Sequence, residues 1–178
     1  MLIWLNGPFG VGKTSGAEAL VKRLPGALLY DAELVGAMLR RIVGGIDPIP
    51  DFQDLAVWRA LVPETARRLR DAYRCSLVMP LTVWRRDYFD ELAAALRTVD
   101  KDLRCFRLTA AEQVLRARII GRPTSDGPHD WCLTHVPTGL ALMRETAFGE
   151  EIATDSRSPD QIAEAIVAAL EVRTAVAD

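Results

Sequence analysis

The stretch Ile3-Trp-Leu-Asn-Gly-Pro-Phe-Gly-Val-Gly-Lys-Thr14 decides the fold of this chain. The apolar run from Leu2 to Leu5 is typical of a buried strand, and Asn6-Gly7 ends it. Residues 7–14 then fit the pattern G-x-x-x-x-G-K-[ST], a phosphate-binding loop (P-loop) that joins a strand to a helix. Glycines let the backbone wrap around phosphates, and the N-terminus of the following helix adds partial positive charge. The stretch therefore predicts binding of a nucleoside triphosphate.

The P-loop supplies most of the expected nucleotide contacts. Lys13 can reach the β- and γ-phosphates, which makes it a predicted catalytic residue, and the Thr14 hydroxyl can ligate Mg²⁺. We expect ATP and Mg²⁺ as cofactors, held by these residues: Gly7, Phe9, Gly10, Val11, Gly12, Lys13, Thr14 and Ser15.

Short apolar runs alternate with helical patterns along the rest of the chain. Further strands are predicted at 27–30, 76–81, 103–108 and, weakly, 151–154, with helices between them. A long helical pattern over 55–73 contains Pro63, which should kink or split it. Residues 122–130 are predicted to form a loop, followed by a helical, Trp-containing segment. Such alternation predicts an α/β fold in three layers, with a parallel sheet covered by helices on both faces.

Composition limits the remaining possibilities. The 178 residues suit a single domain over 1–178, and Lys+Arg 22 against Asp+Glu 24 gives a net charge of −2, which argues against a nucleic-acid partner. The three cysteines are too scattered for a metal knuckle or a disulfide framework. Neither a membrane-spanning run nor a basic signal-peptide start is present, so we expect a cytoplasmic protein.

A P-loop alone does not separate kinases from ATPases and GTPases. The third strand ends in Pro80 and Thr82 rather than in a magnesium-binding acid, and no NKxD-like guanine signature occurs. Kinases of small molecules often use a mobile basic lid instead. We expect a lid at about residues 116–135, in which Arg118 and Arg122 share one helix face and bind transferring phosphate, with Arg118 also contacting nucleotide. The alternative is a solvated helix face.

Asp31 is the candidate catalytic carboxylate. It follows the second strand, at the sheet edge where ligands bind in parallel sheets, so it can accept a proton from a substrate hydroxyl or hold Mg²⁺ through water. The alternative is a helix cap before Glu33. Arg40 and Arg59 could clamp an anionic substrate or be surface charges, and Trp58 could wall the substrate pocket or belong to the core. Arg157, after the fifth strand, could stack on adenine.

The chain resembles the ATP-binding tunicamycin resistance proteins, a P-loop family of the nucleoside- and nucleotide-kinase type. The resemblance spans roughly residues 3–122. It rests on the P-loop stretch and on these motifs: Tyr30-Asp31, Gly36 to Arg40, Asp51-Phe52-Gln53, Trp58-Arg59, Met79-Pro80 with Thr82, and Tyr88-Phe89.

This resemblance implies five parallel strands in the order 2-3-1-4-5, a lid, ATP binding and tunicamycin resistance, with Phe52 among the substrate-binding residues. Some members carry a longer C-terminal tail linked with membrane association. The present sequence ends at Asp178 without a basic amphipathic extension, so membrane association is doubtful.

The leading hypothesis is an ATP-dependent phosphotransferase. Its expected substrate is a hydroxyl of the nucleoside antibiotic tunicamycin or of a UDP-sugar-like small molecule. Two alternatives stay open at this point: a protein that sequesters the drug when loaded with ATP, and a housekeeping kinase of a small metabolite.

Overall fold

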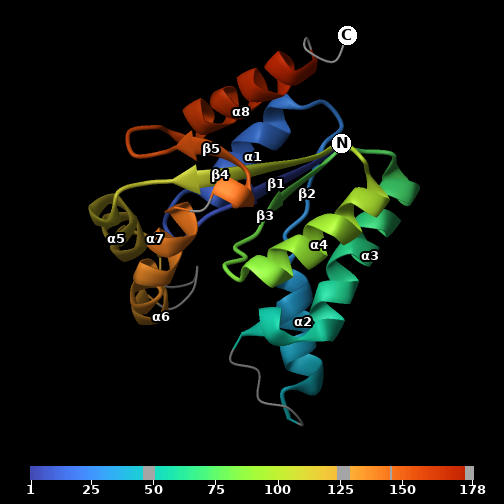
Figure 1. The fold of residues 1–178 in the computed structure, drawn as a ribbon, viewed down its shortest axis with the longest axis horizontal. Coiled ribbons are helices and arrows are strands. Elements are labelled where there is room, and N and C mark those ends of the chain that lie inside the picture. The colour runs from blue at the N-terminus through green and yellow to red at the C-terminus, as the bar shows by residue number, and fades with distance from the viewer. Residues whose placement is uncertain (46–50, 124–128, 145, 175–178) are drawn as a thin grey trace.

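The computed structural model describes residues 1–45, 51–123, 129–144 and 146–174. A five-stranded parallel sheet forms the centre of the fold. The strands lie in the order β2-β3-β1-β4-β5, as predicted (Figure 1). Their bounds are β1 Leu2–Asn6, β2 Leu28–Leu29, β3 Leu77–Pro80, β4 Leu103–Thr109 and β5 Glu150–Ala153. The central strand β1 pairs with β3 on one side and β4 on the other, so the P-loop that follows it emerges at the middle of the sheet edge.

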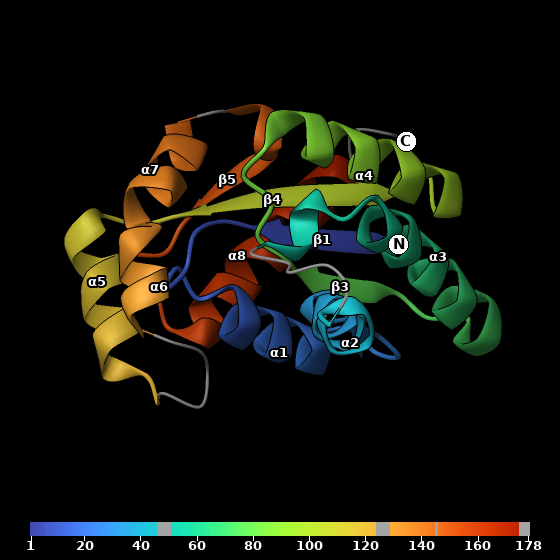
Figure 2. The same cartoon turned by 90° about the horizontal axis from the view of Figure 1, so that it is seen from below.

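Helices cover both faces of this sheet (Figure 2). Their bounds are α1 Lys13–Arg23, α2 Glu33–Val43, α3 Ala56–Tyr73, α4 Arg86–Val99, α5 Glu112–Gly121, α6 His129–Thr134, α7 Val136–Arg144 and α8 Pro159–Thr174. Alternate residues of β1 enter two separate hydrophobic clusters. Ile3 and Leu5 pack on the side of α1 and α8, whereas Leu2 and Trp4 pack on the side of α3 and α4. The near-complete burial of β1 explains its uninterrupted apolar run.

Two short 3₁₀ helices complete the path, η1 at Phe52–Asp54 and η3 at Thr146–Phe148. Helices α2, α5, α6 and α7 lie at the end of the sheet where the strands finish (Figure 1). This is the end where the P-loop begins, so these helices surround the candidate site.

Helix α3 differs from the prediction, because Pro63 does not split it. The helix runs unbroken from Ala56 to Tyr73. Trp58, Val62 and Ala66 are all fully buried on one face of α3, on both sides of the proline. Packing along that face stabilises the two halves as one helix and outweighs the single backbone hydrogen bond that proline removes.

The segment after the lid loop forms two helices, α6 and α7, rather than one continuous helix. Of the predicted loop over 122–130, residues 124–128 lie outside the described residues, and α6 begins within it at His129. The predicted start of α8 is confirmed. Ser158 Oγ accepts from the Gln161 N–H, and Gln161 Oε1 accepts from the Ser158 N–H, which is a reciprocal capping box. No described helix is both long and apolar enough to span a bilayer.

Candidate active site

The backbone of the P-loop adopts conformations that require glycine. Gly10 and Gly12 have φ values of +77° and +96°, in the left-handed region. A Cβ on Gly10 would also lie 2.7 Å from the carbonyl oxygen of Leu115 on α5. The loop therefore closes tightly against α5 and opens directly into α1, whose first residue is Lys13. These features fit a loop that cradles the phosphates of ATP.

Asn6 and Thr82 brace the start of the P-loop. The buried Asn6 amide accepts from the N–H groups of Gly7 (2.8 Å) and Val83 (2.9 Å) and donates to the Val83 carbonyl (3.0 Å). The Thr82 hydroxyl donates to the Gly7 carbonyl at 2.9 Å. The segment after β3, which carries no magnesium-binding acid, thus supports the loop mechanically. Asn6 escaped the sequence analysis because its partner Val83 lies 77 positions away.

Lys13 is a buried cation at the base of the loop. Its side chain is 8% exposed, and Nζ donates to the Pro8 carbonyl at 2.9 Å. Burial lowers the pKa of Lys13 to about 8, while the Glu33 carboxylate acts in the opposite direction. An anionic phosphate would supply the charge compensation that this site lacks. Thr14 and Ser15 are exposed on the first turn of α1, where the predicted magnesium ligand Thr14 is accessible.

Glu33 is a site residue that sequence reasoning missed. Burial raises the pKa of this carboxyl group, Lys13 and Arg122 oppose the rise, and Asp31 and Asp51 add to it. Glu33 is therefore within electrostatic range of two cations and two carboxylates. Sequence reasoning treated it as a first-turn helix charge, and the D-x-E spacing behind Asp31 was the available signal.

Asp31 lies where the sequence placed it, immediately after β2 and before α2. One carboxylate oxygen accepts from the backbone N–H of Glu33 at 2.9 Å, so the helix-start alternative is realised. Its second oxygen accepts none of the hydrogen bonds found within the described residues, which leaves it available to a ligand. Asp31 thus lies next to Glu33, whose carboxylate in turn raises the pKa of the P-loop lysine Lys13 against the effect of burial.

The two predicted lid arginines have different surroundings. Arg118 on α5 donates to the Thr154 carbonyl (2.7 Å), and it contacts the Val11 carbonyl (3.4 Å). It thus joins the P-loop to the turn after β5, where Arg157 lies exposed. Arg122, at the end of α5, donates to Cys132 Sγ (2.8 Å) and is close enough to influence the pKa values of Lys13 and Glu33. Arg118 thus contacts the turn that leads to Arg157, and Arg122 lies within electrostatic range of Lys13 and Glu33.

An aromatic cluster docks the lid region on the P-loop. Phe9 packs edge-on against Trp84 (ring centroids 5.5 Å apart) and Trp131 (5.1 Å), and His135 stacks on Trp84 (5.5 Å). On α7, a side chain at Gly139 would clash with Pro8 of the loop. Helices α6 and α7 therefore contact the P-loop directly, which the sequence analysis did not anticipate.

The predicted substrate-binding residues lie around η1. Trp58 is fully buried and belongs to the core. Its Nε1 donates to the Ala32 carbonyl (3.2 Å), and its ring packs against the Phe52 ring, with the centroids 5.0 Å apart. Arg40 lies over the Phe52 ring at 5.7 Å.

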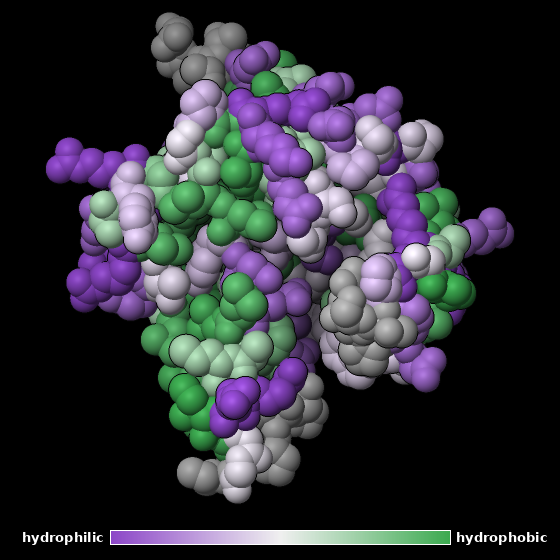
Figure 3. Space-filling model, turned by 180° about the vertical axis from the view of Figure 1, so that it is seen from behind, coloured by the Kyte–Doolittle hydropathy of each residue, from purple (hydrophilic) through white to green (hydrophobic). Residues whose placement is uncertain are grey.

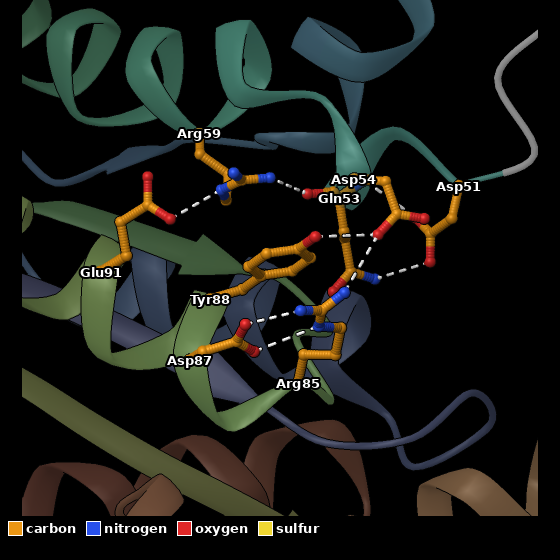
Figure 4. A network of polar contacts seen from close by, with 8 residues as sticks. All are labelled: Asp51, Gln53, Asp54, Arg59, Arg85, Asp87, Tyr88 and Glu91. Carbon is orange, nitrogen blue, oxygen red and sulfur yellow. Dashed lines mark hydrogen bonds and ion pairs between the residues drawn. The ribbon is translucent and has the colours of Figure 1, made fainter.

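Arg59, which the sequence suggests as a clamp for an anionic substrate or as a surface charge, has partners within the protein. It forms an ion pair with Glu91 (2.7 Å) and donates to the Gln53 carbonyl (2.6 Å), as Figure 4 shows. Its guanidinium also stacks on the Tyr88 ring, 4.0 Å from the centroid. The charge of Arg59 is thus used within the protein, where it ties η1 and α3 to α4.

Solved structures share this fold across nearly the whole chain. The tunicamycin resistance protein of Deinococcus radiodurans is 25% identical, with a TM-score of 0.76 over 96% of this chain and 95% of that one. A sugar kinase from Janibacter sp. HTCC2649 is 20% identical (TM-score 0.68, 98% and 96% covered). A gluconokinase from Sinorhizobium meliloti 1021 is 18% identical (TM-score 0.66, 99% and 96% covered).

The fold is therefore that of P-loop kinases of small molecules. A search of curated protein sequences found no match. A family model described as an AAA domain matches residues 2–145, well over half of the sequence, and the chain belongs to this family.

Proposed function

We propose that this protein is an ATP-dependent phosphotransferase that phosphorylates a hydroxyl group of tunicamycin or a related nucleoside. One observation carries the proposal: the P-loop lysine Lys13 and Arg122 of α5 both lie within electrostatic range of the Glu33 carboxylate, which follows Asp31 at the start of α2. Similarity to the Deinococcus tunicamycin resistance protein supports the choice of substrate.

Bound MgATP would supply the γ-phosphoryl group. The P-loop amides and Lys13 would hold the phosphates, and the Thr14 hydroxyl would ligate Mg²⁺. The substrate oxygen forms a bond to the γ-phosphorus, the bond from that phosphorus to the β–γ bridging oxygen breaks, and the hydroxyl proton passes to Asp31 or Glu33. Arg122 would stabilise charge on the transferring group, while Arg118 and Arg157 would border the nucleotide beyond the P-loop.

The decisive experiment incubates the protein with MgATP and tunicamycin and follows the mass of the drug. We expect a gain of one phosphoryl group and one ADP per drug molecule. Asp31→Asn and Glu33→Gln should retain ATP binding, and loss of the proton acceptor should slow transfer by ~10²–10⁴-fold. The matched control is Glu164→Gln, an exposed residue of α8 that pairs with Arg23.

Other results would favour the two alternatives. Tight, ATP-dependent binding of unmodified drug would indicate sequestration. Phosphorylation of a sugar or sugar acid, without phosphorylation of tunicamycin, would indicate a metabolite kinase.

A further inference from the structure

The substrate side of the site is rich in hydrogen-bond acceptors. We call Asp31, Glu33, Asp51 and Gln53 the substrate wall. Asp31 and Asp51 are both close enough to Glu33 to disfavour its charged form. The cations that favour it, Lys13 and Arg122, belong to the P-loop helix and the lid and would serve the phosphates of ATP. The wall therefore presents oxygen atoms and negative charge.

Two arginines near this wall, Arg59 and Arg85, already have carboxylate partners, and a third, Arg40, lies over the Phe52 ring at 5.7 Å. Arg59 pairs with Glu91 at 2.7 Å, and Arg85 pairs with Asp87 at 2.6 Å. Their guanidinium groups lie over the Tyr88 ring, at 4.0 and 3.9 Å from its centroid (Figure 4). A phosphate or carboxylate on the substrate would have to displace an existing carboxylate partner from either guanidinium.

Gln53 provides an independent indication of a ligand. It is 4% exposed, and its backbone N–H and Nε2 donate to the two carboxylate oxygens of Asp51, at 3.0 and 3.3 Å. Its Oε1 is buried and has no hydrogen-bond partner among the described residues. The opposite amide orientation would set Oε1 against the Asp51 carboxylate, so these contacts fix the amide.

The Gln53 side chain extends from η1 to the same side as the Asp51 carboxylate (Figure 4). A buried carbonyl oxygen of this kind calls for a donor. An N–H or O–H group of a substrate would satisfy it.

We propose that the substrate wall selects an uncharged molecule that presents N–H or O–H groups, and that it rejects phosphorylated or carboxylated analogues. This inference rests on the proposed function, since it assigns the substrate class of the same site. Negative charge on a substrate would face the three carboxylates of Asp31, Glu33 and Asp51, against which the nearby Arg40 supplies one positive charge. A free nucleoside fits the wall, whereas a nucleoside phosphate or a UDP-sugar does not.

Equilibrium binding tests this selectivity independently of turnover. The protein is saturated with a non-hydrolysable ATP analogue, so that the P-loop is occupied, and three probes are titrated: tunicamycin, uridine and uridine 5′-monophosphate. We expect at least one uncharged probe to bind ten-fold or more tightly than the monophosphate. Equal or tighter binding of the monophosphate overturns the proposal, and so does binding of none of the three. Selective binding without phosphoryl transfer would instead contradict only the proposed function.

Gln53→Leu tests the role of the unpaired oxygen. Removing Oε1 should weaken binding of the preferred uncharged probe by about ten-fold, the usual value of one hydrogen bond to a ligand. It should leave the urea midpoint of the ligand-free protein nearly unchanged, because removing a buried unpaired oxygen offsets the loss of the hydrogen bond from Nε2 to Asp51. A lower midpoint with unchanged binding would show a purely structural role and overturn the assignment. Asp51→Asn should in addition improve binding of the monophosphate, whereas the control Glu164→Gln should not.

Discussion

Replacing Lys13 by methionine should stabilise the free protein while destroying its nucleotide site. Methionine keeps most of the length of the lysine side chain and removes its charge. In the folded protein, burial lowers the pKa of Lys13 from 10.5 to about 8. This difference of about 2.5 pH units corresponds to roughly 3 kcal/mol at about 1.36 kcal/mol per unit, and it disfavours the charged lysine in the folded state.

The sign of the pH dependence follows from this shift. Between pH 8 and 10.5 the unfolded chain binds the Lys13 proton and the folded chain has released it, so the stability of the native sequence rises with pH across this window. Below pH 8 both states are protonated, and the folded state bears the full cost of the buried charge. The advantage of Lys13→Met should therefore approach 3 kcal/mol at pH 7, less the lost bond to Pro8, and should shrink as pH rises toward 10.5.

Urea denaturation at pH 7, 8.5 and 9.5, with and without MgATP, measures this directly. Without nucleotide, the free energy of unfolding should be higher for Lys13→Met than for the native sequence, and the difference should fall with pH. Adding MgATP should stabilise only the native sequence. A variant that is less stable at pH 7, or a stability difference independent of pH, would refute the reasoning about burial. Equal stabilisation of both proteins by MgATP would refute the phosphate-binding role.

Three further predictions follow from the contacts around the P-loop. Asn6→Ala should lower the free energy of unfolding by about 2–4 kcal/mol in urea denaturation, because it leaves buried backbone groups unpaired. Arg118→Ala should weaken ATP binding measured by calorimetry, since Arg118 joins the P-loop to the turn after β5, whereas Arg122→Ala should reduce kcat with little change in ATP affinity. Gly139→Ala should push α7 away from Pro8 and change the tryptophan fluorescence of the aromatic cluster; an unchanged spectrum would contradict this docking.

Local patterns predicted what depends on near neighbours in the chain. The P-loop, the capping residue Ser158 and the position of Asp31 after β2 each follow from a few adjacent residues. Residues whose roles depend on distant partners were missed or given another role. For Arg59 the sequence left a substrate clamp and a surface charge open, and it did not reveal the ion-pair partner Glu91, which lies 32 positions further along the chain. Spacing carries no information about such pairs, because the packing of α3 against α4 creates them.

Pro63 illustrates the same limit for the fold. Proline removes a backbone hydrogen bond and destabilises a helix interior. The helix is nevertheless continuous, because Trp58, Val62 and Ala66 are buried on a common face. Burial of these side chains contributes several kcal/mol, against about 3 kcal/mol for proline in a helix interior. Tertiary packing therefore decides the outcome, and it is visible only once the partners are known.

Cations and carboxylates act on Glu33 in opposite senses. Lys13 of the P-loop helix and Arg122 of α5 favour the charged form of Glu33, and the carboxylates of Asp31 and Asp51 in the substrate wall disfavour it. The cations Lys13 and Arg122 attract the phosphates of ATP, and the carboxylates of the substrate wall repel them. ATP would therefore bind beside the cations, and an uncharged hydroxyl would bind beside the carboxylates. In the proposed reaction the Glu33 carboxylate would take the proton that the substrate hydroxyl loses as its oxygen bonds to phosphorus. The same separation that would exclude anionic substrates would thus also position the proton acceptor.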